Sequence, residues 1–188
     1  MRQAALLGLG MTEKEFDYVS MQISNIQDLP LDQKASELAA RNPKNMIEAG
    51  IIEFVKPVII ELILLNKPAK AAEIVAKFLS NLNDPDQQVR LRAAGDFTVI
   101  IAGIIEKNGI ELIELSANLL TETAKNETDI AVFSLCNDIL LQCAGYFINA
   151  KKINGAARIT RMWQFIANKG NDFSMNAKKS LERLAKPE

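Results

Sequence analysis

The sequence predicts an all-α fold in which helix pairs stack side by side. Three observations predict it. Apolar residues recur at helical spacing along nearly the whole chain, and no stretch alternates convincingly with the period of two that a strand shows. Hydrophobic residues make up 48% of the 188 residues and aromatic residues only 6%, so the core must be aliphatic. A segment of one apolar helix also recurs about 42 residues later in another.

The repeat is clearest in two long apolar helices. Asp96 and Gly103 recur in register as Asp138 and Gly145, each 42 residues later. A helix pair cannot bury its apolar face alone, so a repeat of this length predicts units that stack on their neighbours. Glycine inside a helix costs roughly 1 kcal/mol relative to alanine. We therefore expect both glycines to allow the close approach of a neighbouring helix.

Residues 1–66 are predicted to form a helical segment that packs on one end of the array. Thr12 and Glu15 have the spacing of a capping box, which opens a first helix. Asp32 is the expected N-cap of a short second helix. Asn42-Pro43 supplies an N-cap followed by proline at the first helical position, which starts a third helix.

Residues 67–188 are predicted to form three helix pairs that continue the same domain. Proline, glycine and clusters of Asn and Asp separate the apolar helices and mark the turns. The helix pairs are expected over residues 68–107, 110–149 and 153–185.

The stretch Asn83–Ala94, which reads Asn-Asp-Pro-Asp-Gln-Gln-Val-Arg-Leu-Arg-Ala-Ala, resembles the turn and second-helix start of a HEAT repeat. The resemblance is to HEAT-like helical repeats of the PBS-lyase and armadillo type, and it covers about residues 67–185. It implies a right-handed α–α superhelix, a HEAT-like solenoid of about three helix pairs with an N-terminal helical segment. Families of this kind mostly act as protein-binding scaffolds, a few bind nucleic acid, and a few act on prosthetic groups or damaged bases.

The resemblance also implies structural roles for individual residues. Asp84 or Asp86 and Arg90 would form a polar ladder between stacked units, and Val89 would face the core. The middle unit departs from this pattern, since Ile and Ala occupy 130–131 where valine and arginine are expected. The ladder is therefore not expected to run through every unit.

The residues that usually carry catalysis or bind metal are few. The chain has no histidine, which excludes histidine general bases, Ser–His and Cys–His pairs and histidine metal ligands. Cys136 and Cys143 lie seven residues apart on one helix, about 10 Å along its axis. That separation is beyond the reach of a disulfide, so both are expected in the core. We expect no enzyme, no cofactor and no metal site.

Two pairs of acidic residues are the remaining candidates for acid–base chemistry. Glu111 with Glu114 and Asp84 with Asp86 lie close in sequence, but such a pair acts as acid and base only if burial raises one pKa. The first pair is expected at the solvent side and the second at a helix cap. An enzyme remains a rival hypothesis that would need a buried carboxylate in a deep pocket.

Charge is distributed unevenly along the chain. Residues 1–150 contain 13 Lys and Arg against 20 Asp and Glu, a formal charge of −7, whereas residues 151–188 contain 9 against 3, a charge of +6. A basic surface of this kind suits a phosphate backbone, an acidic partner or a second copy of the chain. A solvated last repeat with Trp163 in its core also accounts for it. The residues expected to bind a partner are Lys151, Lys152, Arg158, Arg161, Lys178 and Lys179.

The expected function is that of a non-enzymatic protein–protein interaction or scaffold module, which binds another protein or a second copy of itself through rigid stacked helices. The alternative is binding of nucleic acid or an acidic partner through the basic repeat at 151–186. A fragment of a longer solenoid is a further rival, because the mean hydropathy is high at +0.03. The apolar runs at 51–65 and 97–105 are interrupted or too short for a bilayer. A cytoplasmic protein without membrane insertion is therefore expected.

Overall fold

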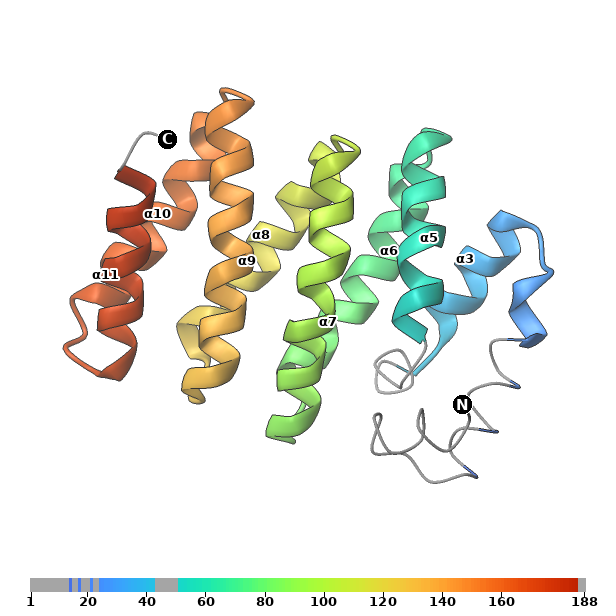
Figure 1. The fold of residues 1–188 in the computed structure, drawn as a ribbon, viewed down its shortest axis with the longest axis horizontal. Helices are drawn as coiled ribbons and strands as arrows, with labels where there is room; N and C mark the ends of the chain where they lie inside the picture. Colours follow the sequence, from blue (N-terminus) through green and yellow to red (C-terminus); the bar gives the residue numbers. More distant parts are fainter. Residues whose placement is uncertain (1–13, 15–16, 18–20, 22–23, 43–50, 186–188) are drawn as a thin grey trace, which may run out of the picture.

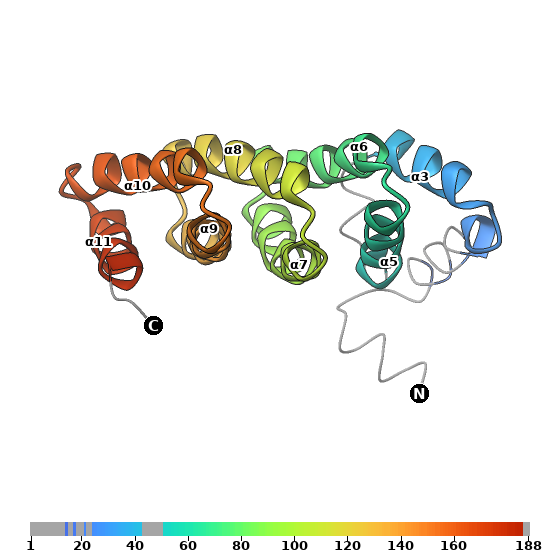
Figure 2. The ribbon, with the colours of Figure 1, turned by 90° about the horizontal axis from the view of Figure 1, so that it is seen from above.

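The computed structural model describes residues 14, 17, 21, 24–42 and 51–185, and these residues are helical or in turns and form no strand. The helices alternate along the chain between two layers (Figures 1 and 2). One layer contains α3 (Leu31–Ala40), α6 (Pro68–Leu79), α8 (Ile110–Asn126) and α10 (Ile153–Ala167). The other contains α5 (Ile51–Leu64), α7 (Gln87–Glu106), α9 (Ile130–Asn149) and α11 (Asp172–Ala185), and the 3₁₀ helix η1 (Ser80–Asn83) follows α6. The capping box expected at Thr12 and Glu15 and the helix expected to start at Pro43 lie outside the described residues.

Each helix contacts the other helix of its pair and its neighbours in the same layer. In Figure 2, α8 lies between α6 and α10, and α9 lies between α7 and α11. The buried apolar residues form one continuous cluster, made mostly of Ile, Leu, Val and Ala, as the composition predicts. Because every helix buries one face against the opposite layer, each pair depends on its neighbours for a complete core.

The N-terminal residues join this array as a fourth helix pair. The helices α3 and α5 contact each other and α6, and α5 also contacts α7. Asn66, the last residue of the expected N-terminal segment, has a φ of 55°, which is matched by 53° at Asn108 and 57° at Lys151. The same left-handed backbone residue therefore follows α5, α7 and α9, and the chain turns back into the other layer after each of them.

Asp32 connects the first described helix pair to the second. It lies in the first turn of α3 and does not cap it, since the N-cap position is Pro30. Its carboxylate instead lies 2.8 Å from Nζ of Lys67 and 3.0 Å from Nζ of Lys70, where α6 begins. Hydrogen bonds from these two ammonium groups hold the pKa of Asp32 below its usual value.

The turn before α7 contains the expected structural residues. Oδ1 of Asp86 accepts the Gln88 amide at 2.9 Å and so caps α7. Oδ1 of Asp84 accepts the Asp86 amide at 2.9 Å, which tightens the turn. Val89 is partly buried against the core, in the position the sequence predicts.

Arg90 joins this turn to the next helix pair. Its Nη1 donates to the carbonyl oxygen of Asp84 at 2.9 Å, and Nε and Nη2 donate to the two carboxylate oxygens of Glu127 at 3.1 Å each. Glu127 also accepts the amides of the two residues that follow it, both at 2.8 Å. In the following pair the position 43 residues after Arg90 is Phe133, which packs edge-to-face on Phe173 with ring centroids 5.0 Å apart. The polar contact is therefore replaced by an aromatic one.

The structure corrects the register between α7 and α9 by one residue. The N-caps Asp86 and Asp129 lie 43 residues apart, as do the left-handed residues Asn108 and Lys151. One residue is a rotation of about 100° around a helix, so Gly103 and Gly145 face different directions. A Cβ at Gly103 would lie 3.1 Å from Cε of Lys56 and 3.2 Å from Cδ1 of Ile60, whereas one at Gly145 would meet nothing within 4 Å. The close approach expected at both glycines is found at Gly103 and is wrong for Gly145.

These surroundings predict opposite results for two glycine-to-alanine changes. Gly145→Ala is expected to raise the free energy of unfolding by roughly 0.5 to 1 kcal/mol, because alanine is the better helix former and its methyl group has open space. Gly103→Ala is expected to give no such gain, because Lys56 and Ile60 must move. Urea denaturation of both variants measures the difference. Equal stabilisation by the two changes would contradict the assigned register.

Within the described residues, α9 is the one helix that is long and apolar enough to cross a membrane by length and composition. The sequence does not predict α9 as such a helix, because Asn137, Asp138 and Gln142 interrupt its apolar run. Half of its most apolar window is buried inside the protein. Since α9 contacts α7, α8, α10 and α11, packing on several sides accounts for its hydropathy.

Candidate functional site

An open groove lies between α8 and α10. Its wider part encloses about 680 Å³, within the size range of ligand-binding clefts. Four side chains from each helix line it: Asn118, Thr121, Glu122 and Lys125 from α8, and Arg158, Arg161, Met162 and Phe165 from α10.

The helical spacing of α10 explains why it presents both apolar and basic groups to this groove. Ile159, Trp163 and Ile166 face the core and are at most 2% exposed. Arg158 and Arg161 are three residues apart and lie together on the solvent side. The core therefore fixes the direction in which both guanidinium groups point.

Phe165 lies outside the buried apolar stripe of its helix. Its side chain is 54% exposed, and the ammonium group of Lys169 lies 4.7 Å from its ring centroid. Lys169 also donates to the carbonyl oxygen of Lys125 at 3.4 Å, across to the last turn of α8. The groove thus combines an exposed aromatic ring with neighbouring cations.

The two arginines of the groove have no carboxylate partner among the described residues. Arg158 donates to the side-chain oxygen of Asn118, and Nε of Arg161 donates to the carbonyl oxygen of Ala157 in its own helix at 3.2 Å. Lys125 is paired with Glu122 at 2.7 Å. The lining of the wider part therefore holds three cations and one carboxylate, an excess of positive charge that favours an anionic ligand.

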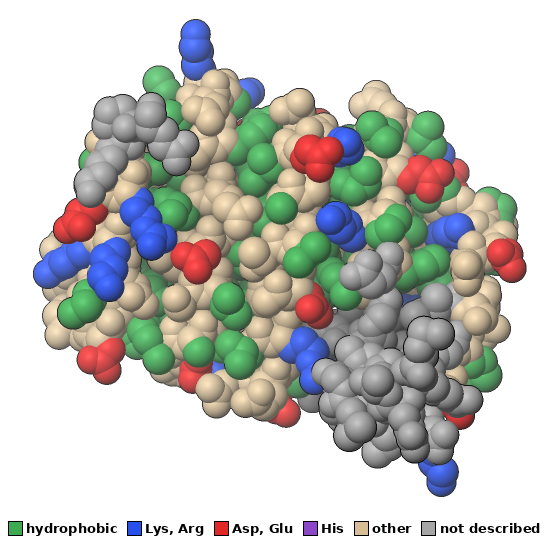
Figure 3. All heavy atoms as spheres, in the orientation of Figure 1, with side chains coloured by type: hydrophobic (Ala, Val, Ile, Leu, Met, Phe, Trp, Pro, Cys, Tyr) green, Lys and Arg blue, Asp and Glu red, His purple; other side chains and the backbone are tan. Residues whose placement is uncertain are grey.

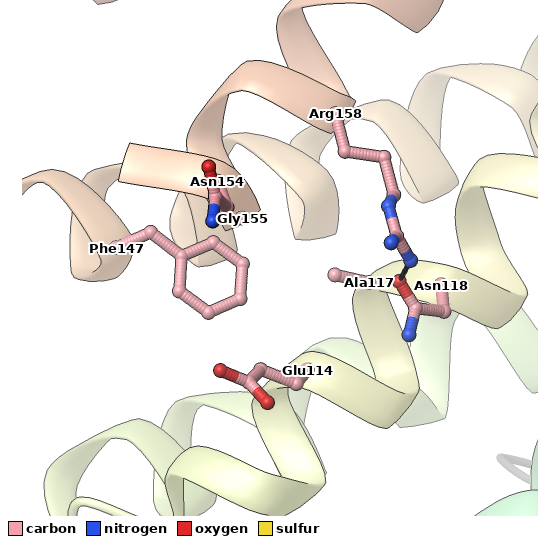
Figure 4. Close-up of a pocket in the computed structure, with 7 residues that line it drawn as sticks. All are labelled: Glu114, Ala117, Asn118, Phe147, Asn154, Gly155 and Arg158. Carbon is pink, nitrogen blue, oxygen red and sulfur yellow. Dashed lines mark hydrogen bonds between the residues drawn. The ribbon is translucent and has the colours of Figure 1, made fainter. Parts of the chain in front are cut away.

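A narrower part of the same groove encloses about 200 Å³ (Figure 4). Asn118 and Arg158 line both parts, so their hydrogen bond marks the division between them. Glu114 lies in the narrow part, and its carboxylate points into the cavity below the Phe147 ring (Figure 4). A Cβ at Gly155 would lie 2.7 Å from that ring, so the missing side chain lets α10 lie directly against it.

The structure separates the basic residues that the sequence grouped together. Arg158 and Arg161 line the groove, and Lys151 and Lys152 are exposed just before α10 begins. Lys178 and Lys179 are exposed on α11, which belongs to the other layer (Figure 2). The basic side chains over α11 appear on the face shown in Figure 3, which is formed by α5, α7, α9 and α11. The basic residues named here therefore lie on two surfaces and do not form a single patch.

Several groove residues were not among the sequence candidates. Phe165 carries a signal that sequence reasoning can use, since it is a large aromatic residue off the apolar stripe of its helix. Asn118 carries none, because it reaches Arg158 only through the packing of two helices 40 residues apart in sequence. In the sequence, Glu114 is a candidate only as half of a carboxylate pair with Glu111, and both side chains are exposed.

Burial changes the acidity of three side chains away from the groove. It raises the pKa of Cys136 and of Cys143 to about 12, so neither thiol forms a reactive thiolate near neutral pH. Burial also raises the pKa of Asp96, on α7, to about 6, against a smaller opposing effect of Arg92. Asp96 lines neither part of the groove.

Among the described residues, no group of three or more acidic or cysteine side chains is arranged to hold a metal ion.

The raised pKa of Asp96 predicts a pH-dependent stability difference for Asp96→Asn. In the unfolded chain this carboxyl ionises near its usual pKa of about 3.9, and in the folded protein near 6. The folded state therefore loses stability as pH rises from about 4 to 6, and the loss stays constant above that range. We expect Asp96→Asn to be roughly 1 kcal/mol more stable at pH 7.5, after allowance for solvent screening of this half-buried group, and little different at pH 4. Thermal unfolding at both pH values measures this, and a pH-independent difference would contradict it.

Comparison with known proteins adds no relative to this picture. No protein-family model matches the chain, and no curated protein or solved structure shows significant similarity to it.

Proposed function

We propose that this chain is a non-enzymatic protein-binding scaffold, a HEAT-like solenoid whose groove between α8 and α10 holds an acidic segment of a partner protein. One observation carries the proposal. The half-exposed ring of Phe165 lies beside Arg158 and Arg161, whose guanidinium groups have no carboxylate partner among the described residues. Exposed aromatic and arginine side chains are enriched where proteins bind one another.

The arrangement of the helices supports a solenoid. A left-handed residue recurs after α5, α7 and α9, and the main contacts of each helix are with helices of its own pair or of an adjacent pair. Arg90 reaches from one unit to Glu127 in the next, a contact of the kind expected of a polar ladder. A stack of this kind is rigid, so little conformational entropy is lost when a partner binds.

Charge complementarity supports an acidic partner segment. Because Lys125 is already paired with Glu122, a carboxylate of the partner would form its strongest ion pairs with the two arginines. Arg–carboxylate pairs are often bidentate and give geometric specificity. An apolar side chain of the partner would bury the exposed face of Phe165 against Met162.

Nucleic acid is the second candidate, and the cations of the groove are the observation that favours it. Two features make it the weaker one. The α8 side of the groove carries Glu114 and Glu122, which interrupt the basic lining that a continuous phosphate backbone would follow. Lys178 and Lys179 are on α11, which lies in the other layer, so they do not extend the groove into a continuous basic track.

A peptide-display selection on the intact chain tests this proposal. The same library is selected on Arg158→Glu/Arg161→Glu and on Lys178→Glu/Lys179→Glu, which change the net charge equally but on different surfaces. We expect the intact chain and the α11 variant to enrich acidic peptides that contain a large apolar residue, and the groove variant to lose them. Equal loss in both variants would point to non-specific charge attraction and contradict the proposal.

Labelled single- and double-stranded DNA oligonucleotides test the alternative. Nucleic-acid binding through Arg158 and Arg161 would show affinity that falls steeply with salt. Tight DNA binding by the intact chain, lost in the groove variant and without selection of acidic peptides, would replace the scaffold proposal with the alternative.

A further inference from the structure

We infer that the bound segment is bipartite: its acidic and apolar residues occupy the wide part of the groove, and a lysine or arginine side chain from the same segment enters the narrow part and pairs with Glu114. This inference rests on the proposed function, because it names what the partner segment must carry besides its acidic and apolar residues.

The two parts of the groove differ in charge. The wide part holds three cations and one carboxylate, whereas the narrow part holds the carboxylate of Glu114 and, at its boundary with the wide part, the guanidinium group of Arg158. Glu114 is exposed, and it makes no hydrogen bond or ion pair with any residue that the structure describes. Arg158 is turned toward Asn118 (Figure 4) and forms no ion pair with this carboxylate. Glu114 is therefore available to a cation from outside.

The size of the narrow part suits one long side chain. Its volume of about 200 Å³ is below the roughly 300 to 1,000 Å³ of small-molecule sites. Phe147 and Ala117 give it apolar walls, and Glu114 provides the charge. A lysine or arginine side chain matches this combination, since its apolar stem can pack against the walls while its charged end reaches the carboxylate.

The geometry of α8 sets the spacing within the segment. Glu114 and Lys125 mark the two ends of the groove and lie eleven residues apart on this helix, a rise of about 16 Å. An extended chain rises about 3.3 Å per residue and spans this length in about five residues. A segment that spans the groove therefore has about four residues between its basic residue at Glu114 and its apolar residue at the other end, beside Lys125 and Phe165.

Fluorescence anisotropy with three labelled peptides tests the inference. The first peptide carries a lysine, a spacer of two Gly and Ser residues and an Asp-Asp-Leu end, the second has alanine in place of the lysine, and the third lacks the spacer. The proteins are the intact chain, Glu114→Gln, Arg158→Glu/Arg161→Glu, and a matched control, Glu111→Gln. Glu111 is an exposed carboxylate one turn earlier on α8 that does not line the groove.

For the intact chain, we expect loss of the lysine or of the spacer to weaken binding roughly two- to fivefold. Glu114→Gln should weaken binding of the lysine peptide by the same factor and leave the alanine peptide unchanged, and Glu111→Gln should bind all three peptides as the intact chain does. An unchanged ratio of lysine to alanine peptide affinity in Glu114→Gln, with binding still lost in Arg158→Glu/Arg161→Glu, would overturn the inference and leave the proposed function standing. If no peptide binds the intact chain better than Arg158→Glu/Arg161→Glu, the proposed function fails and this inference with it.

Discussion

Glu127→Ala is expected to lower the free energy of unfolding by about 3 to 5 kcal/mol. The ion pair between Glu127 and Arg90 is nearly buried, with the two side chains 3% and 14% exposed. Removing the carboxylate leaves the guanidinium of Arg90 partly desolvated and unpaired. It also removes the acceptor for the amides of Thr128 and Asp129. The turn that leads into α9 would lose its ion pair with α7 and keep the hydrogen bond that Gln87 donates to Asp129.

A second ion pair near the end of α8 provides the control. Glu122 and Lys125 lie 2.7 Å apart but are 70% and 35% exposed. Exposed pairs contribute about 0 to 1 kcal/mol, so Glu122→Ala should change the free energy of unfolding by less than about 1 kcal/mol. Guanidinium-chloride unfolding of both variants measures the difference. Similar small effects of Glu122→Ala and Glu127→Ala would show that Arg90 and Glu127 do not connect the two helix pairs.

Trp163→Ala is expected to destabilise the protein by about 3 to 5 kcal/mol. Trp163 is fully buried, and its indole Nε1 donates to Oδ1 of Asn137 at 2.5 Å. Nδ2 of Asn137 in turn donates to Oγ of Ser180 at 2.6 Å. One buried polar chain therefore links α10, α9 and α11, and the alanine variant loses the packing of the ring as well as this link.

Two other substitutions separate these contributions. Trp163→Phe keeps much of the ring volume but leaves the side-chain Oδ1 of Asn137 without its donor. We expect the free energy of unfolding to fall by about 1 to 3 kcal/mol. Phe165→Ala, two residues along the same helix, removes a half-exposed ring and should change stability by about 0.5 kcal/mol or less. Equal destabilisation by Trp163→Ala and Phe165→Ala, measured by thermal unfolding, would contradict the assigned packing of α10.

Most helices and several of their ends were predictable because local chemistry sets them, although Asp32 does not cap α3 as expected. Asp86 and the polar residues before α9 mark helix starts through caps that involve only neighbouring residues. The register between units was not predictable at the same precision. Two helices of similar composition match nearly as well at 42 as at 43, and only the caps and the left-handed residues at the turns distinguish them. This one-residue difference in register decides whether Gly145 faces a neighbouring helix.

The candidate site was only half predictable, because it depends on contacts between distant residues. The basic character of α10 is visible in the sequence, and it identified Arg158 and Arg161. The carboxylate side of the groove comes from α8, about 40 residues earlier, and only the stacking of the helices brings the two together. Alternation between layers also moves Lys178 and Lys179 away from the groove, although they are close to it in sequence.

The most direct test of the proposed binding groove is an affinity comparison at physiological ionic strength. A peptide selected on the intact chain is titrated against that chain, Arg158→Glu/Arg161→Glu and Lys178→Glu/Lys179→Glu. We predict that the groove variant binds at least about tenfold more weakly, and that the α11 variant binds within about twofold of the intact chain. Equal affinity for the groove variant and the intact chain would contradict the proposed binding site.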